Sequence, residues 1–163
     1  MFRKMRRDKQ LLAPEETVEI LKACTSGVLA VHGDNGYPYA VPVSHAYDQG
    51  KLYFHSAKDG HKLDSIVKDE KVSFCVIQKD EVIPETFTTH FRSVIVFGRA
   101  RVLTDADERM HAMRVISAKF SPQYPAEGQA EIERSWDRFN VIEVMIDHMT
   151  GKEAIELVRL RGA

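Results

Sequence analysis

The stretch YPYAVPVSHAYDQGKLYFHSAKDGHKLD, residues Tyr37–Asp64, decides the fold of this 163-residue chain. In its first eleven residues, large side chains at odd positions alternate with small ones at even positions, which is the period of a strand. Asp48–Gly50 then predicts a turn into a second strand at Lys51–His55, and Gly60–Lys68 has the apolar spacing of a short helix. A turn this short joins antiparallel strands, because parallel strands need a long crossover.

The rest of the chain predicts further short strands with helices inserted between them. Asp34–Gly36 (DNG) is a strong hairpin turn, and Gly98 indicates a bend within a long strand. We expect further strands at Gly27–Val31, Val72–Ile77, Ser93–Leu103, Asn140–Asp147 and Glu153–Val158. We expect helices from Pro14 to about Cys24, from Asp105 to about Phe120 and at Glu127–Arg138. Residues 79–91 should form an irregular connection. The sequence therefore predicts one mainly β domain over residues 1–163, a six- to seven-stranded antiparallel small β-barrel with inserted helices.

Charge and composition argue against several classes of function. Lys and Arg number 23 and Asp and Glu 24, so the formal net charge of −1 does not favour binding to nucleic acid. No run of about 18 apolar residues is present, so we expect no membrane span. The basic start, MFRKMRRDKQ, is followed by no apolar stretch, and we expect residues 1–10 to be a flexible solvated tail rather than a secretory signal or an arm for phosphate or lipid. Cys24 and Cys75 sit in apolar runs, as reduced thiols of a cytoplasmic protein do.

The predicted strand that begins at Tyr37 carries two prolines, Pro38 and Pro42, on its small-residue face. Proline cannot donate to a ladder, so this strand should be poorly paired on one side. A flat aromatic ring could lie against this face, with free backbone groups at the edge of the ring. The alternative is an ordinary edge strand that proline protects from aggregation.

A second signal follows where the next strand ends at His55–Ala57 and a helix begins after Gly60. A helix N-terminus offers unpaired N–H groups and partial positive charge, and Lys62 in the first turn adds a cation, so a phosphate monoester would fit there. The alternative is a solvated Lys62 on a helix that Asp59 caps. Arg92, Arg99 or Arg101 could complete a phosphate site, or these arginines could meet acidic residues or solvent.

Other candidate chemistry has little support in the sequence. Seven histidines show no metal-ligand spacing, so we expect no metal site, and no serine or cysteine nucleophile motif is present. Trp136 and Phe139 could form an aromatic wall over a ligand, or could pack in the core or at an interface.

The segments AVPVSHAYDQGKLYFHSAKDGHKLD and SVIVFGRARV, in this order, resemble the pyridoxamine 5′-phosphate oxidase-like FMN-binding split β-barrels. GVLAVHGDNGYPYAVPVSHAY and the AKFSP that ends a later helix are similar to the nitroimidazole-resistance-type branch, and the resemblance covers residues 10 to 150. The chain lacks the arginine-rich pocket expected for oxidation of the vitamin phosphate.

This resemblance implies a homodimer with FMN at the subunit interface. Residues Val41–Ser44 would lie along the isoalloxazine, Lys62 would pair with the phosphate, Ser93 and Val94 would contact the cofactor from a neighbouring strand, and Trp136 would cover the ring from the partner chain. The full set of residues expected to bind FMN is Val41, Pro42, Val43, Ser44, Tyr53, His55, Ser56, Ala57, Gly60, Lys62, Ser93, Val94 and Trp136.

The function expected is that of an FMN-dependent oxidoreductase, which passes electrons from NAD(P)H to a small aromatic or nitro-aromatic acceptor. His55 would be the catalytic proton donor, since an unperturbed histidine has a pKa near 6.5. The alternatives are a non-catalytic flavin- or haem-binding module that acts as a store, sensor or scavenger, with His45, His90 or His148 as axial ligand, and a reductase that uses a deazaflavin.

Overall fold

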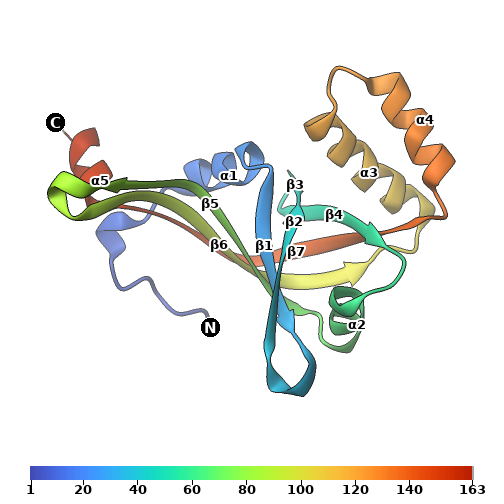
Figure 1. The fold of residues 1–163 in the computed structure, drawn as a ribbon, viewed down its shortest axis with the longest axis horizontal. Helices are drawn as coiled ribbons and strands as arrows, with labels where there is room; N and C mark the ends of the chain where they lie inside the picture. The colour runs from blue at the N-terminus through green and yellow to red at the C-terminus, as the bar shows by residue number, and fades with distance from the viewer. Residues whose placement is uncertain (163) are drawn as a thin grey trace.

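The computed structural model describes residues 1–162, which form one seven-stranded antiparallel sheet in the order β2-β1-β5-β6-β7-β4-β3 (Figure 1). The strands are β1 Ser26–His32, β2 Pro38–Ser44, β3 Ala46–Asp48, β4 Lys51–Ala57, β5 Lys71–Ile83, β6 Thr88–Val102 and β7 Phe139–Glu153. The helices are α1 Pro14–Ala23, α2 His61–Lys68, α3 Ala106–Phe120, α4 Pro125–Ser135 and α5 Ile155–Arg161, with 3-10 turns at Asp8–Gln10, Asp34–Gly36 and Pro84–Thr86.

The sheet curls so that its two ends meet. β2 is at one edge and β3–β4 are at the other, yet Ser44 of β2 and His55 of β4 line the same cleft. Helix α2, which follows β4, packs on β1, and its His61 ring lies 4.1 Å from the ring of Tyr39 in β2. This closure gives the mainly β, antiparallel split barrel that the sequence predicts, and the fold prediction is confirmed.

Apolar side chains form two clusters, one on each side of β4. Leu52 and Phe54 point into the barrel, where they join the main core with Phe74. Tyr53 points outward and packs under α3, in a second cluster that includes Met113. Because side chains alternate along a strand, His55 also points outward, and it is exposed beyond the cover that α3 provides.

Residues 79–91 form an ordered hairpin instead of the irregular connection that the sequence predicts. β5 runs to Ile83 and β6 begins at Thr88, with pairs from Lys79↔Arg92 to Ile83↔Thr88. The hairpin forms the long arm that extends to one side of the molecule in Figure 1. Neither face of this two-stranded ribbon enters the core, so its residues are mostly polar. They therefore show no alternation of apolar side chains from which strands could have been predicted.

The end of the chain also differs from the prediction. β7 is one strand over Phe139–Glu153, where we expected a strand pair turning at Thr150–Gly151. Gly151 pairs with Val94, and a Cβ there would overlap Thr17 Oγ1, so this glycine allows close packing of α1 and marks no turn. The predicted strand at 153–158 is helix α5 from Ile155.

Two smaller differences concern the first half of the chain. The predicted strand Tyr37–Tyr47 is interrupted at His45, which separates β2 from β3. Near the start of the chain, the Phe2 ring stacks 4.7 Å from the ring of His148, and Gln10 is buried. The flexible tail over residues 1–10 stays a prediction. No helix among residues 1–162 has the length and hydrophobicity needed to cross a bilayer.

Candidate functional site

The junction of β4 and α2 has the features of an anion-binding site that the sequence predicts there. Gly60 adopts φ 140°, which favours glycine, and its carbonyl accepts the N–H groups of Leu63 and Asp64. The N–H groups of His61 and Lys62 precede these first bonds and have no acceptor within the helix. Gly60 is the N-cap and no side chain caps the helix, so the alternative of an Asp59 cap is wrong.

The short segment before this helix exposes some of the predicted residues and buries others. His55 and Ala57 are exposed on the outer face of β4. Ser56 is buried, and its hydroxyl donates to the carbonyl of Ala57 at 3.0 Å. The hydroxyl hydrogen of Ser56 is therefore already used within the chain.

β2 is an edge strand, as its prolines predict, and β1 is its only ladder partner in the sheet order. Val41 and Val43 turn toward the core and are half-buried, whereas Pro42 and Ser44 are exposed. The strand therefore presents small side chains and backbone on its outer face. A flat ring and simple edge protection are both compatible with this geometry.

Contacts of α2 bring the candidate anion-binding site at its start next to β2. Besides the stacking of His61 on Tyr39, the His61 Nε2 atom lies 3.6 Å from a carboxylate oxygen of Asp34 in the β1–β2 turn. A Cβ added at Gly33 would come within 3.4 Å of the same nitrogen and 2.7 Å of the Tyr37 carbonyl, so the turn packs closely against the helix. The two sequence signals, 20 residues apart, thus lie close together in space, although Tyr39 is on the core-facing side of β2 with Val41 and Val43.

His55 lies where two clefts meet beside α3 and α4. The larger cleft has a volume of about 600 Å³ and also reaches Ser44, and the smaller one, about 340 Å³, also reaches Ser56 and Ala57. His55 is exposed at the surface, but the protein atoms around the clefts partly shield its ring from water, and this lowers its pKa below the usual value of 6.5. At neutral pH the ring is therefore an uncharged imidazole with one donor and one acceptor nitrogen.

Trp136 packs within the second apolar cluster and caps the end of α4. The guanidinium carbon of Arg109 lies 4.2 Å from the Trp136 ring centroid, and Arg109 Nη2 donates to the Trp136 carbonyl at 2.9 Å. Phe139 meets the indole edge to face at 6.1 Å and lines the smaller cleft beside His55. The structure favours the packing interpretation for Trp136 within its own chain.

Three residues of the expected set are separated from the others. Tyr53 is buried under α3, and Val94 is fully buried in the barrel. Ser93 and Val94 lie on β6, which is a ladder neighbour of neither β2 nor β4: β1 and β5 separate it from β2, and β7 separates it from β4. Contact of Ser93 and Val94 with FMN stays a prediction.

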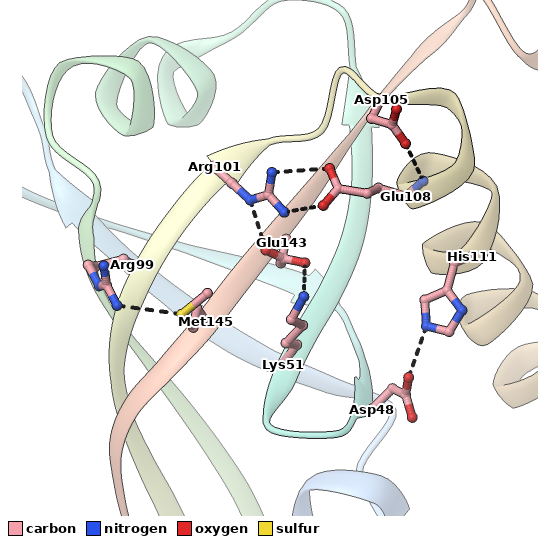
Figure 2. A network of polar contacts seen from close by, with 9 residues as sticks. All are labelled: Asp48, Lys51, Arg99, Arg101, Asp105, Glu108, His111, Glu143 and Met145. Carbon is pink, nitrogen blue, oxygen red and sulfur yellow. Dashed lines mark hydrogen bonds and ion pairs between the residues drawn. The ribbon is translucent and has the colours of Figure 1, made fainter.

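The candidate arginines are held by carboxylates, as one of the two alternatives predicted. Arg101 bonds to Glu143 at 2.8 Å and to Glu108 at 2.7 Å, and Lys51 reaches the other oxygen of Glu143 (Figure 2). Burial disfavours the charge of Glu143, but hydrogen bonds from Lys51 and Arg101 outweigh this and lower its pKa. The remaining pairs are Arg99–Asp147 and Arg92–Glu153.

His45, one of three candidate haem ligands, has a structural role. It is fully buried, and its Nε2 lies 2.9 Å from the Leu21 carbonyl oxygen. Burial, with a smaller effect of the Lys119 charge, lowers its pKa to about 4. Within residues 1–162, no group of three or more His, Cys, Asp and Glu side chains is placed to hold a metal ion.

Sequence reasoning missed the cleft walls that α3 and α4 provide. Met113, Ser117, Tyr124 and Glu127 line the larger cleft, and none carried a motif. The SPQYP break between the two predicted helices could have indicated these walls, because so short a connection makes neighbouring helices antiparallel and places them side by side.

Comparison with known proteins supports the fold. The sequence profile described as pyridoxamine 5′-phosphate oxidase matches residues 13–153. An FAD-binding protein from Mesorhizobium loti is 28% identical, with a TM-score of 0.64, over 89% of this chain and 97% of its own. A proposed 5-nitroimidazole antibiotic resistance protein from Bacteroides thetaiotaomicron is 20% identical, with a TM-score of 0.73, over 88% and 86%. An FAD- and haem-binding protein from Mycobacterium smegmatis is 18% identical, with a TM-score of 0.76, over 95% and 80%.

No curated protein sequence is similar enough to this chain to count as a relative. The profile match nevertheless spans most of the chain, including β2, the junction of β4 and α2, and both walls of the larger cleft. The chain therefore belongs to the pyridoxamine 5′-phosphate oxidase family.

Proposed function

We propose that this protein binds FMN between the start of α2 and the exposed edge of β2. The observation that carries this proposal is the contact of His61 with Tyr39, which places the cationic start of α2 beside the strand whose opposite face carries the exposed small residues. The phosphate would accept from the free N–H groups and Lys62, and the ring would lie along the backbone of Val41–Ser44. We propose FMN rather than FAD because Lys62, at the start of α2, suits a phosphate group at the end of the cofactor.

A second copy of the chain would complete the site. Pro42, Val28, Cys75 and Ile95 are register partners in a row across four strands of the outer sheet face. Val28 and Ile95 are 41% and 38% exposed, which is unusual for large apolar residues on a sheet. A two-fold partner that covers this row would also cover the outer face of β2. Ser93, Val94 and Trp136 would then serve the partner's cofactor or the interface.

The proposed reaction passes electrons from NAD(P)H to a small aromatic or nitro-aromatic acceptor. A bound flavin supplies the redox chemistry that no side chain of this chain provides. Overall, a nitro group takes up two electrons and two protons and loses water to give a nitroso group, while the nicotinamide gives up a hydride and one further proton comes from solvent. His55, exposed where the clefts meet, would pass protons from solvent to the acceptor.

The test is the absorbance spectrum of freshly purified protein, followed by mass measurement of the released molecule and anaerobic addition of NADH or NADPH. We expect flavin bands, the mass of FMN, and bleaching by one of the nicotinamides. Protein that takes up no FMN would contradict the proposal, and yellow protein that neither nicotinamide bleaches would remove its enzymatic half.

A flavin- or haem-binding module without turnover is the second candidate, since the Mycobacterium smegmatis protein of similar fold binds FAD and haem. His45 is buried and bonded, so the haem version would need His90 or His148. A Soret band in the same spectrum would favour this candidate.

A further inference from the structure

The larger cleft has the size and lining of a small-molecule site. Its volume of about 600 Å³ falls within the range of roughly 300–1,000 Å³ that is typical of ligand pockets. Met113, Ile116 and Ile132 give it buried apolar walls, and the exposed rings of Phe120 and Tyr124 stand nearer to solvent. Besides two carboxylates, the polar groups of the lining are His55 and the hydroxyls of Ser44, Ser117, Ser121 and Tyr124.

The walls of this cleft are firmly packed. α3 and α4 approach so closely at Gly128 that a Cβ there would overlap the Ser117 hydroxyl oxygen. Met113 and Ile132 also belong to the second apolar cluster, which anchors both helices to β4 and β7. The width between the helices and the outer face of His55 is therefore set before any ligand binds, which suits recognition of a rigid, flat molecule.

Acidic groups dominate the charge of the larger cleft. Glu127 and Glu131 are the carboxylates in its lining, and the lining includes no Lys or Arg. A hydrogen bond from the Ser135 hydroxyl and the nearby Arg134 lower the pKa of Glu131, and Arg134 also forms an ion pair with it that compensates its charge. Glu127 makes no ion pair with any described residue. Arg138 lines the smaller cleft together with Glu131 and acts on that carboxylate, so Glu127 carries the uncompensated negative charge of the larger cleft.

We propose that this cleft receives the electron acceptor and selects flat aromatic molecules that are neutral or carry a positive group. The inference rests on the proposed function, since it places the acceptor beside His55. The apolar walls would hold the ring, and Glu127, which has no ion-pair partner among the described residues, would attract a cationic or hydrogen-bond-donating substituent. A dianionic pyridine phosphate, the substrate type in the family's name, would meet the unpaired carboxylate of Glu127 there and no Lys or Arg in the lining.

The test compares three probes with the same ring: 4-nitrobenzylamine, which is cationic, 4-nitrotoluene, which is neutral, and 4-nitrobenzoate, which is anionic. Their dissociation constants are measured at pH 7 by calorimetry, on the protein as purified and on protein saturated with FMN. We expect the amine to bind about tenfold more tightly than the benzoate, with the toluene between them. Glu127→Gln should reduce the preference for the amine over the benzoate by roughly threefold.

Glu133→Gln is the matched control, because Glu133 lies on α4 outside the lining and bonds to Gln129. It should leave all three constants unchanged. Equal or tighter binding of the benzoate, or an equal effect of Glu133→Gln and Glu127→Gln, would overturn the proposal. Loss of FMN uptake with an intact preference among the probes would contradict the proposed function and leave the cleft's selectivity standing.

Discussion

Replacing Lys119 by methionine should destabilise the fold and loosen the end of β2. The Lys119 ammonium, near the end of α3, donates to the carbonyls of Cys24 and, at 2.8 Å, His45, and lies 3.5 Å from that of Leu21. Two of these carbonyls belong to the C-terminal end of α1, where helix groups lack partners, and the third follows Ser44. One side chain therefore joins α1, α3 and the break between β2 and β3.

The size of this effect can be worked out from the contacts. A hydrogen bond from a charged donor contributes about 1.5–3 kcal/mol, and Lys119 makes two short ones. Burial lowers the pKa of Lys119, which shows that removing its charge from water offsets part of this gain. We expect a net loss of about 2–3 kcal/mol, or a decrease in Tm of roughly 5–10 °C for a domain of this size.

Urea and thermal unfolding of Lys119→Met, followed by circular dichroism, measure this loss. Lys22→Met is the matched control, because Lys22 on α1 makes an exposed pair with Glu19 and should matter by less than about 1 kcal/mol. A Lys119→Met protein as stable as the control would refute the role given to this contact.

Three further predictions use other parts of the molecule. His45 has a pKa of about 4 in the folded protein and near 6.5 in the unfolded chain, so the unfolded chain binds more protons between these pH values. The free energy of unfolding should therefore fall by about 3 kcal/mol as the pH falls from 6.5 to 4. Urea titrations of His45→Gln over the same pH range should show a smaller fall. Ile95→Asp should give a monomer in light scattering, whereas Val67→Asp on α2 should not, and a dimeric Ile95→Asp protein would place the interface elsewhere. In His55→Gln, the inflection that we expect below pH 6.5 in the rate of acceptor reduction should disappear while FMN affinity holds; an unchanged profile would assign the proton to another group.

Patterns over a few neighbouring residues predicted the elements that form the candidate site. Alternation from Tyr37 onward gave β2 and its exposed small-residue face, and Gly60 with Lys62 gave the start of α2. Each of these depends on local chemistry: the donor that proline lacks, or the conformation that glycine permits.

Features that depend on distant contacts could not be predicted in the same way. The sequence could not place β6 relative to the site, because strand order is fixed by which apolar faces meet in the barrel; β1 and β5 lie between β6 and β2, and β7 lies between β6 and β4. The pairing of Arg101 with Glu143 joins residues far apart in the chain, so the sequence left its partner open. The hairpin at 79–91 was missed because its backbone pairing requires no apolar pattern.

The central claim is that the start of α2 holds the phosphate of FMN, and one comparison of affinities tests it most directly. Fluorescence titration gives the affinities of FMN and of riboflavin, which lacks the phosphate, for the protein, for Lys62→Gln and for the control Lys68→Gln at the other end of α2. We predict that Lys62→Gln weakens FMN by about tenfold or more and leaves riboflavin unchanged, because one charge-assisted hydrogen bond is lost, while Lys68→Gln alters neither. Equal affinities of FMN and riboflavin for the unaltered protein, or an equal effect of Lys62→Gln on both ligands, would contradict the account.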